Sequence, residues 1–165
     1  MNILVFIISA IGLYGFITKL SAAGATLQLY FERDYTCPES FRGTQKKSDL
    51  LHSANCFMVS LYAVILLAYG LVYLFRSSAA FAPAVLLYAC MVNVLHIVVN
   101  EQFLVKSGLK EKMNSIMNQW KTQKRITKNN DDEVRLYRMI KESYVNNRYN
   151  LLYLAGMLVM YFIVK

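Results

Sequence analysis

The residues best suited to chemistry are Asn93, His96 and Asn100, which interrupt a largely apolar run between residues 80 and 103 that also holds Glu101 and Gln102 near its end. Spacings of three and four residues place all three on one face of a helix. Polar groups within a membrane-spanning helix are costly, so they mark a role in function or in assembly. We interpret this face as an interhelical polar contact, in which amide and imidazole groups bond to neighbouring helices.

His96 could instead ligate a haem or assist proton transfer. A b-type haem normally needs a second axial ligand, and His52 is the only other histidine. Both histidines are predicted near the same end of adjacent helices, so they could approach one another. Hydrogen bonding is the favoured interpretation, and no cofactor is expected. Glu101 is predicted to be a solvated charge at headgroup level rather than a proton relay.

No other pattern indicates a reaction centre. The three cysteines, Cys37, Cys56 and Cys90, form neither a CxxC motif nor a cluster with histidine, so no metal site or disulfide framework is predicted. The chain contains no phosphate loop, nucleophile elbow, HExxH motif or pair of carboxylates within an apolar run. We therefore assign no catalytic residue.

The elements that position these residues are predicted to be membrane helices. Hydrophobic residues make up 56% of the chain and charged residues only 17%, concentrated in a few segments. The fold class is an all-α integral membrane protein, a single multi-pass domain over 1–165 with about four transmembrane helices. The predicted spans are about 3–25, 51–75, 80–103 and 149–164. The first is interpreted as a span rather than a signal peptide, because no positive charge precedes its apolar run.

The connections between the spans differ in length. Pro38 and Gly43 are expected to break any regular element in the first loop, residues 26–50. The second and third spans are separated by a short turn at Ser77 and Ser78, which predicts a tight antiparallel helical hairpin. Pro83 falls in the first turn of the third span, where a missing amide proton costs little.

A basic extramembrane helical hairpin is predicted over 106–147, between the third and fourth spans. An N-cap at Asn129–Asp132 separates two amphipathic helices. Their apolar stripes are spaced as in a helix and comprise Leu109, Met113, Ile116, Met117 and Trp120, facing Val134, Tyr137, Ile140 and Tyr144. We expect Trp120, Met113, Met117 and Tyr137 to bind a partner, with Trp120 as the anchor. Alternatively, the first helix lies flat on the membrane.

The net charge of +8 is interpreted as a topology signal, because eleven of the 18 basic residues fall within 104–148. The positive-inside rule places loops 26–50 and 104–148 in the cytosol or the mitochondrial matrix, and both termini on the opposite side. Anionic phospholipids are expected at Lys121, Lys124, Arg125 and Arg148. Nucleic acid is not expected as a partner, because Trp120 is the only aromatic residue within 106–128.

Residues 32–39 resemble a segment of the membrane-associated eicosanoid and glutathione enzymes, which are four-helix proteins of similar size. The resemblance is carried by Glu32-Arg33-Asp34-Tyr35 and Cys37-Pro38-Glu39. It would imply a lipid or glutathione-type substrate at a headgroup-level site with Arg33, Tyr35 and Glu39. The basic segment before the fourth span and the missing Arg/Asn spacing depart from that family, so membership is not inferred.

Three functions follow as expectations. The first is an accessory or scaffolding subunit of a larger membrane complex, without catalysis of its own and bound to other membrane protein subunits. The second is a small membrane enzyme acting on a lipid or glutathione-type substrate. The third is a pore or carrier component that uses the polar face of the third span. The mitochondrial inner membrane is favoured slightly over the endoplasmic reticulum.

Overall fold

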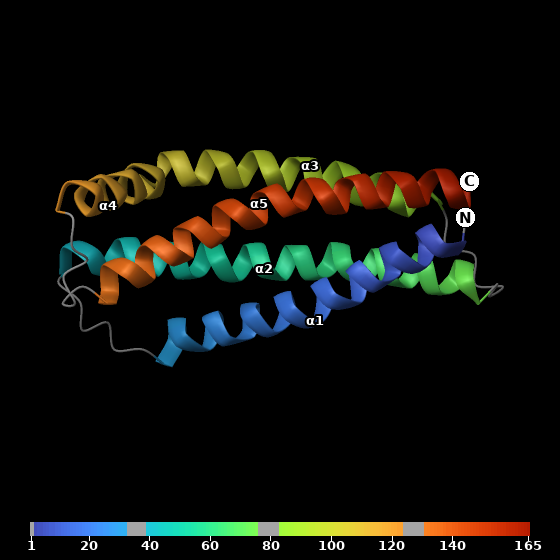
Figure 1. The fold of residues 1–165 in the computed structure, drawn as a ribbon, viewed down its shortest axis with the longest axis horizontal. Helices are drawn as coiled ribbons and strands as arrows, with labels where there is room; N and C mark the ends of the chain where they lie inside the picture. Colours follow the sequence, from blue (N-terminus) through green and yellow to red (C-terminus); the bar gives the residue numbers. More distant parts are fainter. Residues whose placement is uncertain (1, 33–38, 76–82, 124–130) are drawn as a thin grey trace.

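The protein is a bundle of long helices. The computed structural model describes residues 2–32, 39–75, 83–123 and 131–165. Within this described part there is no strand, and the helices are α1 (Asn2–Glu32), α2 (Glu39–Leu74), α3 (Pro83–Lys106), α4 (Leu109–Gln123) and α5 (Asp131–Val164). Figure 1 shows α1, α2, α3 and α5 running side by side, with both termini at one end and α4 at the other. We call these the terminal end and the basic end.

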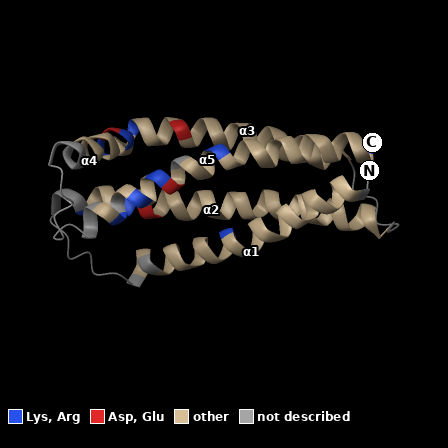
Figure 2. Ribbon diagram, viewed as in Figure 1, with Lys and Arg blue, Asp and Glu red and all other residues tan. Residues whose placement is uncertain are grey.

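Among the described residues, three helices are long and apolar enough to cross a membrane: Ile3–Gln28, Arg42–Leu74 and Pro83–Lys106. The prediction of an all-helical, multi-pass membrane protein is confirmed at this level. Charged residues gather toward the basic end, over α4, the first half of α5 and the start of α2 (Figure 2). Helix α5 has a charged first half at the basic end. Its second half is apolar and runs beside the other helices to the terminal end (Figure 1).

The helix boundaries follow local sequence signals. α3 begins at Pro83, whose ring fixes the backbone angle that a first helical turn needs. α5 begins at Asp131, as the run of Asn and Asp residues predicts. α3 ends before Gly108, which has a φ of 72° and whose amide donates to the carbonyl of Val105 at 3.1 Å. Glycine adopts this left-handed conformation without steric cost, so the chain turns there into α4.

The prediction of an irregular first loop is wrong for residues 26–32 and 39–50, whereas Pro38 lies outside the described residues. α1 continues to Glu32, and α2 begins at Glu39 and passes through Gly43. Glycine in a helix costs at most about 1 kcal/mol relative to alanine, which tertiary packing readily offsets. That packing comes from Gln45, Ser48 and Asp49, which are almost completely buried at helical spacing.

The expected tight hairpin of the second and third spans is also wrong. α2 and α3 touch at few positions, whereas α5 packs against both of them. The most extensive contact in the bundle joins α1 to α2. The two backbones approach closely at Gly12, where a β-carbon would lie 2.8 Å from the carbonyl oxygen of Ala63. Small residues permit this backbone approach, which is a common way of packing membrane helices.

Two apolar clusters lie at different heights in the bundle. The larger one fills the core with residues of α1, α2, α3 and α5, among them Val5, Leu66, Leu86 and Met157. The smaller one joins α4 to the rest at the basic end, through Leu51, Leu104, Leu109, Ile116 and Ile140, with Met113 and Tyr137 packed against it. Leu109 and Ile116 of α4 therefore pack in one cluster with Ile140 of α5, and α2 and α3 contribute Leu51 and Leu104 to it.

Candidate functional site

The interior of the bundle changes from apolar to polar toward the basic end. Buried polar side chains from α2, α3 and α5 converge there: His52, Ser53, Asn55, Asn93, Asn100, Ser143, Asn146, Asn147 and Asn150. Such groups are costly in a membrane protein unless they bond to one another. We call this set, with His96, the polar core.

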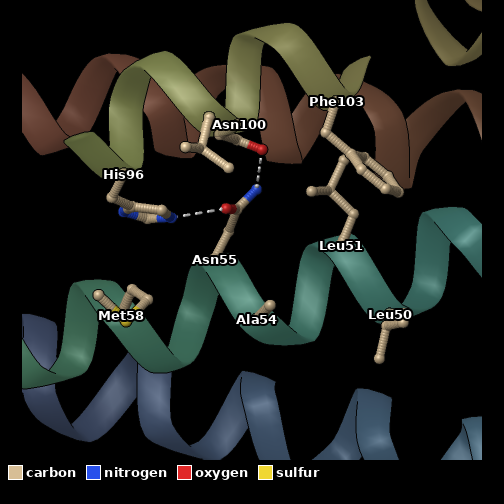
Figure 3. A pocket seen from close by; sticks show the side chains of 9 residues that line it. Leu50, Leu51, Ala54, Asn55, Met58, His96, Asn100 and Phe103 are labelled. Carbon is tan, nitrogen blue, oxygen red and sulfur yellow. Dashed lines mark hydrogen bonds between the residues drawn. The ribbon is translucent and has the colours of Figure 1, made fainter. Parts of the chain in front are cut away.

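His96 is the central member of a hydrogen-bonded chain that joins three helices. Its Nε2 donates to Oδ1 of Asn55 at 3.0 Å, and Nδ2 of Asn55 donates to Oδ1 of Asn100 at 3.2 Å (Figure 3). On the other side, Nδ2 of Asn150 donates to Nδ1 of His96 at 3.4 Å. A neutral imidazole protonated on Nε2 satisfies both contacts. All three bonds point the same way, from α5 through α3 and α2 and back to α3.

A second chain begins at Lys19, the only charged residue within Ile3–Gln28. Its ammonium donates to Oδ1 of Asn146 at 2.7 Å, and Nδ2 of Asn146 donates to the sulfur of Cys56 at 3.5 Å. The same sulfur lies 3.6 Å from Nε2 of His52, which in turn lies 3.7 Å from Oε2 of Glu142. This chain therefore connects α1, α5 and α2.

Charged pairs cap the polar core at the basic end. Oε2 of Glu101 accepts from Nδ2 of Asn147 at 3.4 Å, and its Oε1 lies 3.7 Å from the ammonium of Lys110. Arg135 lies 3.9 Å from the buried carboxylate of Asp49. Glu101 therefore takes part in pairing α3 with α4 and α5, beyond the solvated role expected for it.

The height of the His96 chain in the bundle follows from helix geometry. At about 1.5 Å per residue, Asn55 lies about 28 Å along α2 from Leu74, and His96 about 20 Å along α3 from Pro83. The hydrocarbon core of a bilayer is about 30 Å thick. If Leu74 and Pro83 mark one surface of that core, Asn55 lies just inside the other surface and His96 lies about 10 Å inside it.

Some polar atoms of this core have no hydrogen-bond partner among the described residues. Both amide atoms of Asn93 are buried and unbonded, and so is the hydroxyl of Tyr62, whose ring lies 6.1 Å from that of His96. The two ends of the His96 chain, Oδ1 of Asn150 and Nδ2 of Asn100, are also unbonded. Buried atoms of this kind are where ordered water is found in protein interiors.

The structure brings together only some of the residues that the sequence singled out. His96 and Asn100 bond across to other helices, whereas Asn93 lies on the same face and has no hydrogen-bond partner within the part of the chain that the structure describes. Met113 and Tyr137 pack in the smaller apolar cluster, Met117 is half-buried, and Arg148 is exposed on α5. The described part of the structure does not include the side chains of Trp120, Lys121 and Glu39. It also does not include residues Lys124, Arg125, Arg33 and Tyr35.

Sequence reasoning missed the partners of His96. Asn146 and Asn147 precede the apolar half of α5 and Asn150 lies at its start, and their spacing places 146 and 150 on one helical face. Asn55 and Cys56 likewise lie in the predicted second span, 51–75, which is uncharged throughout. Like Asn93 and Asn100, these asparagines on α2 and α5 are polar residues in or beside predicted spans, and they could have indicated interhelical hydrogen bonds in the same way.

The described residues contain no group of three or more His, Cys, Asp or Glu side chains that could hold a metal ion. Both nitrogens of His96 are engaged in hydrogen bonds, so haem ligation would require breaking one of them. Comparison with known protein families, with curated proteins and with solved structures finds no match for this chain.

Proposed function

We propose that the protein is an accessory, scaffolding subunit of a larger membrane complex, without catalysis of its own. The observation that carries the proposal is the His96 chain. The best candidate for a reactive group has both of its nitrogens committed to asparagines on α2 and α5. Hydrogen bonds of this kind fix the register of membrane helices, which suits a role in holding a shape.

The proposed topology has four spans, with the apolar half of α5, residues 149–164, as the fourth. This half runs beside the three apolar helices to the terminal end (Figure 1). The positive-inside rule then puts the basic end in the cytosol or the matrix, and both termini opposite. α4 and the first half of α5 form the extramembrane hairpin. The mitochondrial inner membrane is our preferred location, because small basic subunits without motifs are common there.

Partner binding is proposed for the surface around α4. Leu109 and Ile116 are buried within the chain itself, so they need no partner. Met117 is half-buried, and Trp120 lies one turn beyond Ile116 along α4. This C-terminal part of α4 is where another subunit, or anionic phospholipid at Lys121, Lys124, Arg125 and Arg148, would bind.

The proposal is tested by isolating the protein from its native membrane. A tagged chain expressed at its natural level is solubilised in mild detergent, separated on a native gel and analysed by mass spectrometry. We expect one particle, much larger than the chain alone, with the same partner chains at fixed stoichiometry in every preparation. The Trp120→Ala variant should lose partners while its helix content is unchanged. A wild-type chain that runs alone would contradict the proposal.

A second candidate, a pore or carrier component, is favoured by one observation. Asn93 is completely buried, and both of its amide atoms are unbonded within the described part of the chain. Such a residue could hold water in a polar path that begins at the basic end. Liposomes containing the protein would then conduct protons or a small polar solute, and Asn93→Leu would abolish the flux. Liposomes no leakier than protein-free ones would exclude this candidate.

A further inference from the structure

A groove of about 260 Å³ lies between α2 and α3. It exists because these two helices touch at few positions. Figure 3 shows the side chains that line it. Six are apolar, namely Leu50, Leu51, Ala54, Met58, Val99 and Phe103, and three are polar, namely Asn55, His96 and Asn100.

The polar residues do not make the groove polar. Asn55 and Asn100 are almost completely buried, and the bonds between Asn55, His96 and Asn100 turn their polar atoms toward one another (Figure 3). The open side is bordered by Leu50 and Val99, which are about half exposed. In a bilayer this surface would face hydrocarbon, so a hydrocarbon chain can enter from the side.

Two lysines continue the walls of the groove toward the basic end. Lys47 shares a helical face with Leu50, Leu51 and Ala54, because it precedes them by three, four and seven residues. Lys106 shares a face with Val99 and Phe103, seven and three residues before it. Both side chains are exposed. A positive charge therefore stands one turn beyond the apolar lining on each wall.

The height of these charges matches a lipid headgroup. Asn55, which lines the groove, lies near the surface of the hydrocarbon core by the helix lengths given above. Lys47 lies about 12 Å further along α2, at the level of the headgroups. We propose that the groove binds one acyl chain of an anionic phospholipid, whose phosphate is held between Lys47 and Lys106. This site is separate from the basic residues of α4 and α5 discussed above.

Native mass spectrometry of the full chain tests this proposal. The protein is reconstituted in nanodiscs of phosphatidylglycerol and phosphatidylcholine in equal amounts, released into detergent, and its bound lipids are identified. We expect one retained phosphatidylglycerol per chain. The double variant Lys47→Gln/Lys106→Gln should lower the protein's preference for phosphatidylglycerol over phosphatidylcholine about thirty-fold, as expected for about 1 kcal/mol per lysine at a membrane surface. Ala54→Phe should fill the groove and lower retention of both lipids.

A matched control removes the same charge elsewhere at the basic end. Arg138 and Lys141 are exposed on α5, and their double substitution by Gln should leave the preference unchanged. The proposal is overturned if the groove variant Lys47→Gln/Lys106→Gln keeps the wild-type preference, or if the control loses it equally. The proposal is also overturned if the spectrum of the wild-type protein shows only the lipid-free chain, or a dimer in place of the lipid-bound chain.

Discussion

At the scale of single residues, the bundle depends on how asparagine amides are used. An amide has both donor and acceptor atoms, so it can continue a chain of hydrogen bonds in one direction. Asn55 does this by accepting from His96 and donating to Asn100. Asn146 does the same between Lys19 and Cys56. These residues link helices that have few apolar contacts with one another, such as α2 and α3.

Replacing His96 tests whether its bonds are structural. His96→Leu leaves Oδ1 of Asn55 and Nδ2 of Asn150 without their partner, and a buried group in that state costs about 1–3 kcal/mol. We expect the free energy of unfolding to fall by about 2 kcal/mol, measured by titration with SDS in mixed micelles. His96→Gln, which keeps a donor and an acceptor, should recover part of that loss. Equal stability of His96→Leu and wild type would contradict a structural role.

Asn93 should behave in the opposite way. Its amide makes no hydrogen bond among the described residues, so Asn93→Leu breaks none and removes a buried polar group. We expect the unfolding free energy to stay the same or rise by about 1 kcal/mol in the same SDS titration. A loss as large as that of His96→Leu would show that Asn93 is bonded in the membrane, and would favour the water-filled path.

The sequence predicted one half of this core and missed the other. Spacing along a single helix identified His96 and Asn100 as members of one face. Their partners Asn55 and Asn150 lie on other helices, and which residues of two helices meet depends on tilt and register. Those quantities are set by packing, for example at Gly12, and no spacing within one helix encodes them.

At the scale of helices, the closest packing is between α1 and α2. A β-carbon at Gly12 would lie 2.8 Å from the Ala63 carbonyl and 3.0 Å from the Leu67 amide nitrogen, and both are backbone atoms that cannot move alone. Gly24, on the same helix, has nothing within 4 Å of that position. The two glycines therefore have different roles, although their sequence contexts look similar.

This difference predicts opposite effects of one substitution. Gly12→Ala should force α1 away from α2 and lower the unfolding free energy by about 1–3 kcal/mol, as overpacking does in cores. Gly24→Ala should raise it by up to about 1 kcal/mol, because alanine favours the helix. Both are measured by SDS titration of the purified variants. Similar values for the two variants would show that α1 does not pack on α2 through Gly12.

The starts of α3 and α5 were predicted better than the helices that pack together. Pro83 and Asp131 begin α3 and α5, because N-terminal signals act locally. The first loop was misjudged because three of its polar residues, Gln45, Ser48 and Asp49, are buried, and Asp49 lies beside Arg135. The hairpin of the second and third spans was misjudged because a short connection does not force two helices into contact when a third, α5, packs on both.

At the scale of the whole molecule, the bundle is longer than a bilayer is thick. α2 has 36 residues and is about 54 Å long, against about 30 Å of hydrocarbon. The excess carries the charged residues at the basic end (Figure 2). We therefore expect the basic end to stand in water, with the polar core in the half of the membrane nearest that end and the larger apolar cluster within the hydrocarbon.

Side-specific cysteine labelling tests the four-span arrangement most directly. In a cysteine-free background, Lys112→Cys places a thiol on α4 and Lys165→Cys places one at the C-terminus. If α5 crosses the membrane, a membrane-impermeant maleimide should label Lys112→Cys only from the cytosolic or matrix side and Lys165→Cys only from the opposite side. If both positions are labelled from the same side, α5 does not cross the membrane and the four-span bundle is wrong.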